Sequence, residues 1–232
     1  MSDGMGETGL QQFIIWGLTD PLRDYFARLG RDVLVGADQF FYWVKGDRRS
    51  VIAPDVYLIE DETMAPRDVD CWKVWDHDGK APALALEIVS EKTHKKDYRP
   101  ETHARYEALG VGELVRFDPD HIGTRRRLLT HWVRGASGRL VQQDHPHDRI
   151  HSARFDFWLI AQPDKSLRMS VDGVILWPTA AERLAVDEAR IHAAEARTRE
   201  AESRAREAVS RTHEAEAETA RLRAELARLR GE

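Results

Sequence analysis

The sequence has one cysteine, no long apolar run and no surplus of positive charge. Cys71 alone excludes an intramolecular disulfide and a zinc site built from several cysteines, and we expect a reducing cytoplasm as the compartment. No run of 18 apolar residues occurs, so we expect no transmembrane helix, and the first residues lack the basic segment and apolar core of a secretory signal. The net charge of −5 argues against strong non-specific binding to nucleic acid. This net charge does not exclude an enzyme that acts on nucleic acid through a metal site within a small basic groove.

Two common catalytic motifs are also absent. No glycine-rich phosphate loop follows a strand signal, which gives no support to a P-loop or dinucleotide fold. No serine stands in a Gly-x-Ser-x-Gly setting, so a serine hydrolase of that type is unsupported as well.

The chain changes composition sharply near Pro178. From Ala180 onward most residues are alanine, glutamate or arginine, which are strong helix formers, and this stretch has no proline and no aromatic residue. All seven tryptophans, five tyrosines and seven phenylalanines precede it. We therefore predict two domains, a globular one over residues 1–178 and a helical tail over residues 179–232.

Within the tail, small and apolar residues recur with a period of seven. The positions between them are mostly glutamate and arginine, which is the a and d pattern of a coiled coil. Two interpretations fit, a single solvated helix held by Glu–Arg pairs or a coiled-coil homodimer, and we favour the homodimer. The a series is Leu184, Ile191, Thr198, Ala205, Thr212, Thr219 and Leu226, and the d series is Asp187, Ala194, Ala201, Ala208, Ala215, Leu222 and Leu229.

The first 178 residues carry interleaved strand and helix signals and predict a mixed α/β fold. Asp20-Pro21 is typical of a helix start, and Gly30 is expected to end that helix after Leu29. A second helix is predicted from Pro100 to Leu109. Many strands with few helices favour a central mixed sheet flanked by helices. The predicted strands cover residues 33–35, 40–44, 51–60, 72–75, 83–89, 113–117, 126–133 and 155–160.

Two carboxylates lie in apolar strand contexts. Asp55 interrupts the run Val51–Ile59, and Glu87 interrupts the run Ala83–Val89. A carboxylate inside a buried strand is costly unless it is paired or binds a metal. If the two strands pair, Asp55 and Glu87 can share one end of the sheet and hold Mg²⁺, which takes one or two carboxylates, several waters and a substrate phosphate. The alternative is that both face water or pair with arginine.

Several short motifs follow one another in an order that resembles a known family. In chain order they are Pro54-Asp55-Val56, Pro82–Ser90, Asp97, Tyr106–Leu114 and Asp118-Pro119. Their order and spacing are similar to those of the Uma-two family of restriction endonucleases, a branch of the PD-(D/E)XK nuclease superfamily. The resemblance covers roughly residues 33–119 and continues more loosely to residue 177.

This resemblance implies a restriction-endonuclease-like α/β core and hydrolysis of phosphodiester bonds with Mg²⁺ or Mn²⁺. It assigns Asp55 and Glu87 as the metal-binding carboxylates. The superfamily adds a lysine that positions the water or neutralises the phosphate, and here the chain departs from the pattern. Val89 stands where that lysine is usual, and the helix before Tyr106 has none. We assign the role to Lys96 in the preceding loop.

Other basic residues lie near these motifs. His103 and Arg105 are alternatives to Lys96, and Lys92 and Lys95 extend a small basic cluster around it. A second cluster, Arg125-Arg126-Arg127, either contacts phosphates or begins a solvated strand. Together the clusters can form a local positive groove on an acidic protein, as a nuclease needs.

We therefore predict a metal-dependent endonuclease with DNA as its partner, paired as a homodimer through the tail. In this hypothesis Asp55 and Glu87 hold the metal, a bound water attacks phosphorus, and Lys96 neutralises the developing charge. The missing lysine supports an alternative from another class, a catalytically degenerate nuclease fold that serves as a nucleic-acid- or protein-binding scaffold. A third hypothesis is a coiled-coil protein whose globular head binds another protein.

Overall fold

The computed structural model describes residues 5–62, 70–90 and 98–231. It divides into two compact units, Met1–Ala180 and Ala181–Glu232. Within the described residues, no helix is long and apolar enough to cross a membrane.

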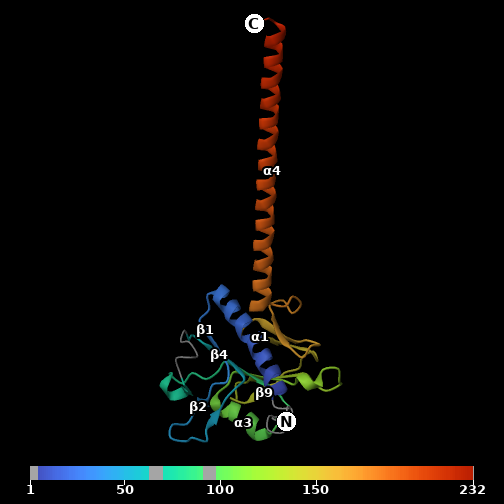
Figure 1. Ribbon diagram of the computed structural model, residues 1–232. Helices are drawn as coiled ribbons and strands as arrows, with labels where there is room; N and C mark the ends of the chain where they lie inside the picture. The colour runs from blue at the N-terminus through green and yellow to red at the C-terminus, as the bar shows by residue number, and fades with distance from the viewer. Residues whose placement is uncertain (1–4, 63–69, 91–97, 232) are drawn as a thin grey trace. The chain divides into compact units, whose positions relative to one another are not determined.

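The first unit is built on a six-stranded mixed sheet with the strand order β1-β4-β6-β7-β8-β9 (Figure 1). β6 and β7 run parallel, and all other neighbours are antiparallel. The predicted central mixed sheet is confirmed. Its strands are β1 (Val33–Gly36), β4 (Val56–Glu60), β6 (Leu84–Ile88), β7 (Glu113–Phe117), β8 (Leu129–Arg134) and β9 (Leu140–Gln142).

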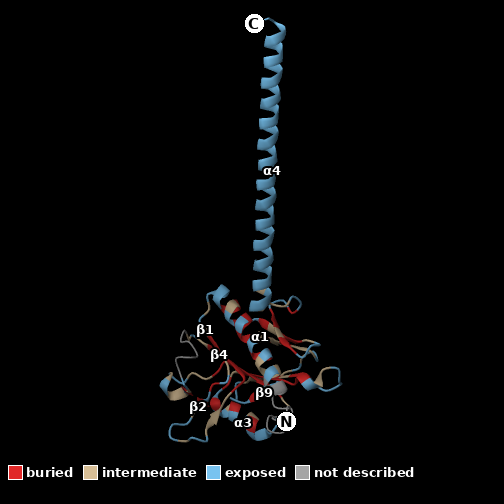
Figure 2. Ribbon diagram, in the orientation of Figure 1, coloured by how far each residue is buried: buried red, intermediate tan, exposed pale blue. Residues whose placement is uncertain are grey.

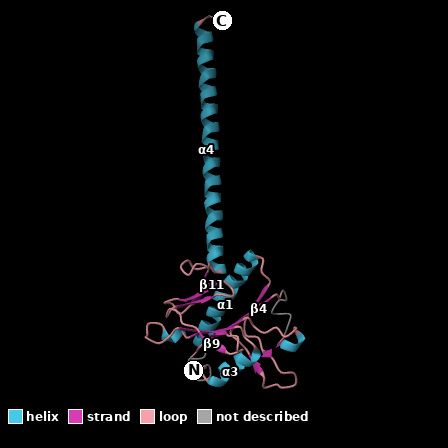
Figure 3. Cartoon of the chain, turned by 180° about the vertical axis from the view of Figure 1, so that it is seen from behind, coloured by secondary structure: helices cyan, strands magenta, loops and turns pink. Residues whose placement is uncertain are grey.

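The two faces of this sheet carry separate cores. On one face, α1 (Met5–Leu29) packs together with a three-stranded antiparallel sheet of order β10-β11-β12. On the other face, α3 (Pro100–Leu109) forms the crossover between β6 and β7 and packs with Tyr106 and Leu109 inward. Figure 3 shows these helices around the strands. The strands of the second sheet are β10 (Arg149–Ser152), β11 (Phe157–Ala161) and β12 (Leu167–Ser170).

A third, small sheet adds to the core on the α3 face. Its order is β3-β2-β5, and its buried Phe41 and Trp72 rings pack against each other, with Phe41 also packing against Tyr57 of β4. These strands are β2 (Phe41–Tyr42), β3 (Val51–Ile52) and β5 (Trp72–Lys73), and two short 3-10 helices are η2 (Val74–Asp76) and η3 (Pro119–His121).

α1 begins much earlier than the Asp20-Pro21 signal predicts. The helix runs from Met5 to Leu29 with Pro21 in its interior. An interior proline costs about 3 kcal/mol. However, α1 buries Ile14, Leu18 and Phe26 almost completely, and each such side chain contributes about 1.5–3 kcal/mol. Tertiary packing therefore outweighs the local start signal, while the helix ends at Leu29 as predicted.

Pro54 divides the predicted strand over residues 51–60 into two. β3 and β4 belong to different sheets, because a proline has no N–H to donate to a central ladder. Asp55 therefore lies just before β4 and not inside a strand. The predicted strand over residues 72–75 ends at Lys73, where η2 follows, and the sequence prediction misses β9, β10 and β12.

The second unit is a single helix, α4 (Ala180–Leu229), which has 50 residues and none of them buried. Figure 2 shows it exposed along nearly its whole length. At 1.5 Å per residue it is about 75 Å long. The predicted long C-terminal helix is confirmed.

Candidate functional site

The structure brings Asp55 and Glu87 to the same end of the central sheet. β4 and β6 are antiparallel with Val56 opposite Leu86, and the continued register places Asp55 opposite Glu87. Asp55 Oδ2 accepts a hydrogen bond of 2.6 Å from the backbone N–H of Ile88, which belongs to the peptide bond that follows Glu87. Asp55 is 8% exposed and Glu87 is 9% exposed. Two buried carboxylates thus share the carboxyl end of β6.

Asp55 is anchored from two sides. Its second oxygen, Oδ1, accepts a hydrogen bond of 2.6 Å from Gln11 Nε2 of α1. These two hydrogen bonds fix the orientation of the Asp55 carboxylate. Carboxylate oxygens are also the ligands that Mg²⁺ prefers. The residues present therefore fit a divalent cation.

A buried arginine that the sequence analysis did not select lies beside Glu87. β6 and β7 are parallel with Arg116 next to Glu87, and side-chain alternation places both on the α3 face. Arg116 is 6% exposed, and its Cζ lies 4.8 Å from the ring centroid of Tyr98 and 4.9 Å from that of Trp132. Aromatic stacking holds a guanidinium in place while it keeps its charge.

The signal for Arg116 was available in the sequence. A charged residue interrupts the apolar part of Glu113–Phe117, as Asp55 and Glu87 interrupt their own runs. What the sequence could not give is the register that sets Arg116 against Glu87, because that depends on the β6–α3–β7 crossover.

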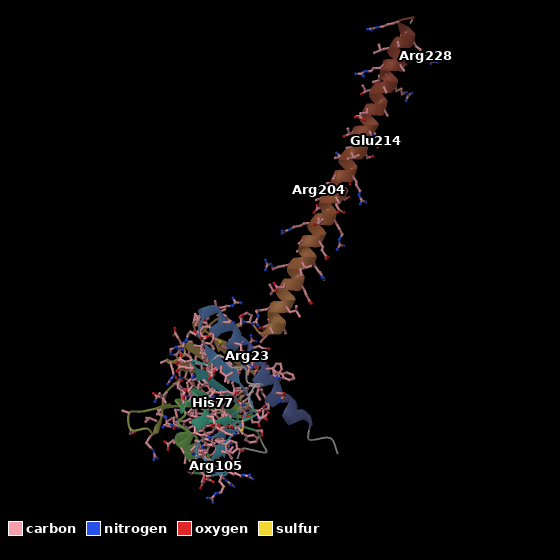
Figure 4. The ribbon with its side chains drawn as sticks, turned by 90° about the vertical axis from the view of Figure 1, so that its left-hand side faces the viewer. Arg23, His77, Arg105, Arg204, Glu214 and Arg228 are labelled. Carbon is pink, nitrogen blue, oxygen red and sulfur yellow. The ribbon has the colours of Figure 1, made fainter. Side chains whose placement is uncertain are left out.

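Of the two alternatives to Lys96 that lie within the described residues, only His103 is close to this cluster. Its ring centroid is 5.2 Å from that of Trp132. Burial lowers the pKa of His103 from 6.5; the negative charge of Glu107 opposes this effect, and the positive charge of Arg116 adds to it. Arg105, by contrast, is exposed and donates a hydrogen bond of 3.3 Å to the carbonyl of Val51 (Figure 4).

A small cavity with basic walls adjoins the Arg116 stack. It has a volume of about 380 Å³, and Thr130 in its wall is the register partner of Arg116. Two members of the predicted cluster Arg125–Arg127 therefore lie near the carboxylate end of the sheet. Lys92, Lys95 and Lys96 fall outside the described residues, so the role of Lys96 stays a prediction. The cavity is lined by Tyr98, His121, Arg126, Arg127 and Thr130.

A larger cavity, of about 1040 Å³, lies at the opposite ends of β6 and β7, where Ala83 and Gly112 line it. Its wall includes Glu113 and His131, which form a buried pair with 3.0 Å between Oε2 and Nε2. Ser152 Oγ donates a hydrogen bond of 3.0 Å to the other Glu113 oxygen. This polar cluster ties β7, β8 and β10 together, far along the strands from Asp55.

Within the described ranges, no group of three or more histidine, cysteine, aspartate or glutamate residues is arranged to hold a metal ion. The pair Asp55–Glu87 is therefore the acidic site on which the metal hypothesis depends.

Comparison with known proteins places this mixed-sheet fold in a nuclease class. The Uma2 family model, described as "Putative restriction endonuclease", matches residues 2–161. The match covers more than half of the chain, and the chain belongs to this family. The resemblance drawn from the motifs around Asp55 and Glu87 is thereby confirmed.

One solved structure is similar over much of the chain. It is described as "a putative nuclease belonging to DUF820 from Anabaena variabilis", with 14% sequence identity and a TM-score of 0.41. The alignment covers 64% of this chain and 73% of that one. No curated protein matches the sequence.

Proposed function

We propose that this chain is a metal-dependent endonuclease that hydrolyses phosphodiester bonds in DNA. The observation that carries the proposal is the junction of Asp55 and Glu87, two buried carboxylates on neighbouring strands, one of which bonds the peptide next to the other. Carboxylate oxygens are the protein ligands that Mg²⁺ prefers, and Mg²⁺ usually takes one or two of them together with waters and a substrate phosphate. Membership of a restriction endonuclease family supports the same reaction class.

In this proposal Asp55 and Glu87 hold Mg²⁺ or Mn²⁺. A bound ion of this kind lowers the pKa of a water and stabilises charge on a phosphate. Asp55 is oriented by Gln11 and by the Ile88 N–H, so its carboxylate needs little reorganisation when the cation binds.

Arg116 is the residue that we propose for the positive charge usually supplied by lysine. It lies beside Glu87 in the strand register, it is fixed between Tyr98 and Trp132, and it adjoins the cavity lined by Arg126 and Arg127. A preorganised guanidinium in a partly desolvated site stabilises charge that develops on a phosphate oxygen. Lys96 remains the alternative.

The experiment is nicking of supercoiled plasmid with Mg²⁺ or Mn²⁺ by the full chain. Asp55→Asn and Glu87→Gln keep the side-chain shapes and remove the charges, and both should abolish nicking. Arg154→Met is the matched control, because Arg154 is exposed and lines the larger cavity at the opposite ends of β6 and β7, and it should leave nicking unchanged. Arg116→Met and Lys96→Ala then show which side chain supplies the positive charge at the phosphate, since only the variant of that residue should lose nicking activity.

The same assay decides the alternative function, a catalytically degenerate nuclease fold that binds nucleic acid or protein. Val89 at the usual lysine position favours this alternative. It predicts no nicking by the natural chain and no calorimetric binding of Mg²⁺. Nicking that disappears in Asp55→Asn would contradict it.

We further propose that the protein acts in the cytoplasm as a homodimer paired through α4. The single cysteine, Cys71, supports a reducing compartment. The heptad pattern of α4 supports pairing. Light scattering of the full chain, compared with a chain ending at Pro178, tests the second point, because a monomeric mass for both would contradict it.

A further inference from the structure

The heptad seam of α4 gathers most of the large apolar side chains of the helix. Leu184 and Ile191 at its start, and Leu222, Leu226 and Leu229 near its end, are each more than half exposed. All five occupy a or d positions and so follow one line along the helix. An exposed line of leucines on an otherwise charged helix marks a surface that packs against a partner.

The threonines in the middle of this line are compatible with a buried seam. Thr198, Thr212 and Thr219 stand at a positions, and each hydroxyl donates to the carbonyl oxygen four residues earlier, at 3.1, 2.9 and 2.8 Å. Their hydrogen-bonding capacity is therefore met within the helix. Each threonine can then turn its methyl group to the seam without leaving a buried hydroxyl unsatisfied.

The charges beside the seam select both the partner and its direction. In a parallel, in-register pair of identical helices, a g residue faces the e residue five positions later on the partner. Six of the seven such pairs in this sequence join opposite charges, and none joins like charges. The seventh sets Arg204 against Val209. The six pairs are Arg183–Glu188, Arg190–Glu195, Arg197–Glu202, Arg211–Glu216, Glu218–Arg223 and Glu225–Arg230.

The antiparallel arrangement gives a different result. With Leu184 opposite Leu229, g residues face g residues and e residues face e residues. Three of these contacts then join like charges, and four join opposite charges. The like-charge contacts are Arg204–Arg204, Arg197–Arg211 and Glu202–Glu216, and the opposite-charge contacts are Arg183–Glu225, Arg190–Glu218, Glu188–Arg230 and Glu195–Arg223. Like charges so placed are destabilising. The parallel arrangement sets Asp187 against Asp187 in the seam, but none of its flanking contacts joins like charges, so the flanking charges favour the parallel direction.

We infer that α4 binds a second copy of this chain as a parallel, in-register coiled coil. This goes beyond pairing as such and does not depend on nuclease activity. It has a structural consequence: the attachment points of the two globular units lie side by side, whereas antiparallel helices would set them about 75 Å apart. Two nuclease units would then be able to act on one duplex.

Cysteine crosslinking tests the direction in the full chain with Cys71→Ser. Ala194→Cys is at a d position, and the parallel arrangement sets the two introduced cysteines against each other. The chain should therefore crosslink with itself in a glutathione redox buffer. In the antiparallel arrangement residue 194 lies opposite residue 219, and the two introduced cysteines are about 37 Å apart. A crosslink between Ala194→Cys and Thr219→Cys chains, with none between Ala194→Cys chains, would overturn the inference, as would a monomeric mass.

Charge reversal tests the pairing itself by sedimentation equilibrium. Arg197→Glu sets two glutamates against each other at both symmetric contacts and should raise the dissociation constant roughly tenfold. Arg197→Glu combined with Glu202→Arg should restore it. Glu214→Arg, at an outward c position (Figure 4), is the matched control and should have little effect. Failure of the double variant to recover would refute the assigned contacts.

Discussion

Replacing Asp55 should separate the folding role of this residue from its chemical role. Asp55→Ala removes the acceptor of the buried Ile88 N–H and of the half-buried Gln11 amide. Hydrogen bonds to a charged group contribute about 1.5–3 kcal/mol each, and water can replace Asp55 at Gln11. We therefore expect the free energy of unfolding to fall by about 2–4 kcal/mol. For a unit of this size, the melting temperature should drop by about 5–15 °C.

Asp55→Asn should behave differently. The asparagine carbonyl oxygen can still accept from the Ile88 N–H. Gln11 can rotate its side-chain amide so that the Gln11 oxygen accepts from the asparagine side-chain NH₂. The loss of stability should then stay below about 1 kcal/mol. The negative charge is nevertheless gone, so calorimetric Mg²⁺ binding and plasmid nicking should disappear.

Thermal melting followed by circular dichroism, with titration calorimetry on the same samples, measures both effects. An unchanged melting temperature in Asp55→Ala would refute the two hydrogen bonds as stabilising contacts. Mg²⁺ binding retained by a folded Asp55→Asn would refute Asp55 as a metal ligand. The two variants separate these roles, because Asp55→Ala removes the hydrogen-bond acceptors, whereas Asp55→Asn keeps an acceptor and removes the charge.

Two further predictions concern the fold around the site. The pKa of folded His103 is below the unfolded value of 6.5. The stability that neutral His103 contributes is therefore fully present above pH 6.5 and is lost as the pH falls through the folded pKa. In urea unfolding, the free energy of unfolding should fall less between pH 8 and pH 5 in His103→Gln than in the natural chain, and an equal fall would contradict the burial of this ring. Gly36→Ala should destabilise the chain severely, because its Cβ would lie 2.1 Å from the buried Tyr57 ring. Gly17 lies on α1 with open space around it, so Gly17→Ala should stabilise the chain by about 0.5–1 kcal/mol. Melting temperatures that change in the same direction in the two variants would refute this contrast.

Local patterns in the sequence predicted a good part of this molecule. α3 was predicted from Pro100 to Leu109 because proline begins a helix and Gly110, at φ 96, ends it. β7 follows directly from its apolar run. α4 follows from composition, since nothing in residues 180–229 competes with helix. The family, too, could be recognised from motifs around Asp55 and Glu87.

Other features depended on contacts between distant residues. Pro21 lies inside α1 because Ile14, Leu18 and Phe26 are buried by strands far away in the chain. Asp55 lies before β4 because the chain changes sheets at Pro54.

The sequence by itself determined which residues are charged and which segments are helical or extended, because these depend on side-chain chemistry and on neighbours a few positions away. Only the tertiary structure decided that Asp55 meets the peptide after Glu87 and that Arg116 lies beside that glutamate. Strand order and register are set by burial summed over whole faces of the sheet. A single residue's context cannot reveal such a sum, so the sequence marks Arg116 only as a charge in an apolar run, and the fold places it beside Glu87.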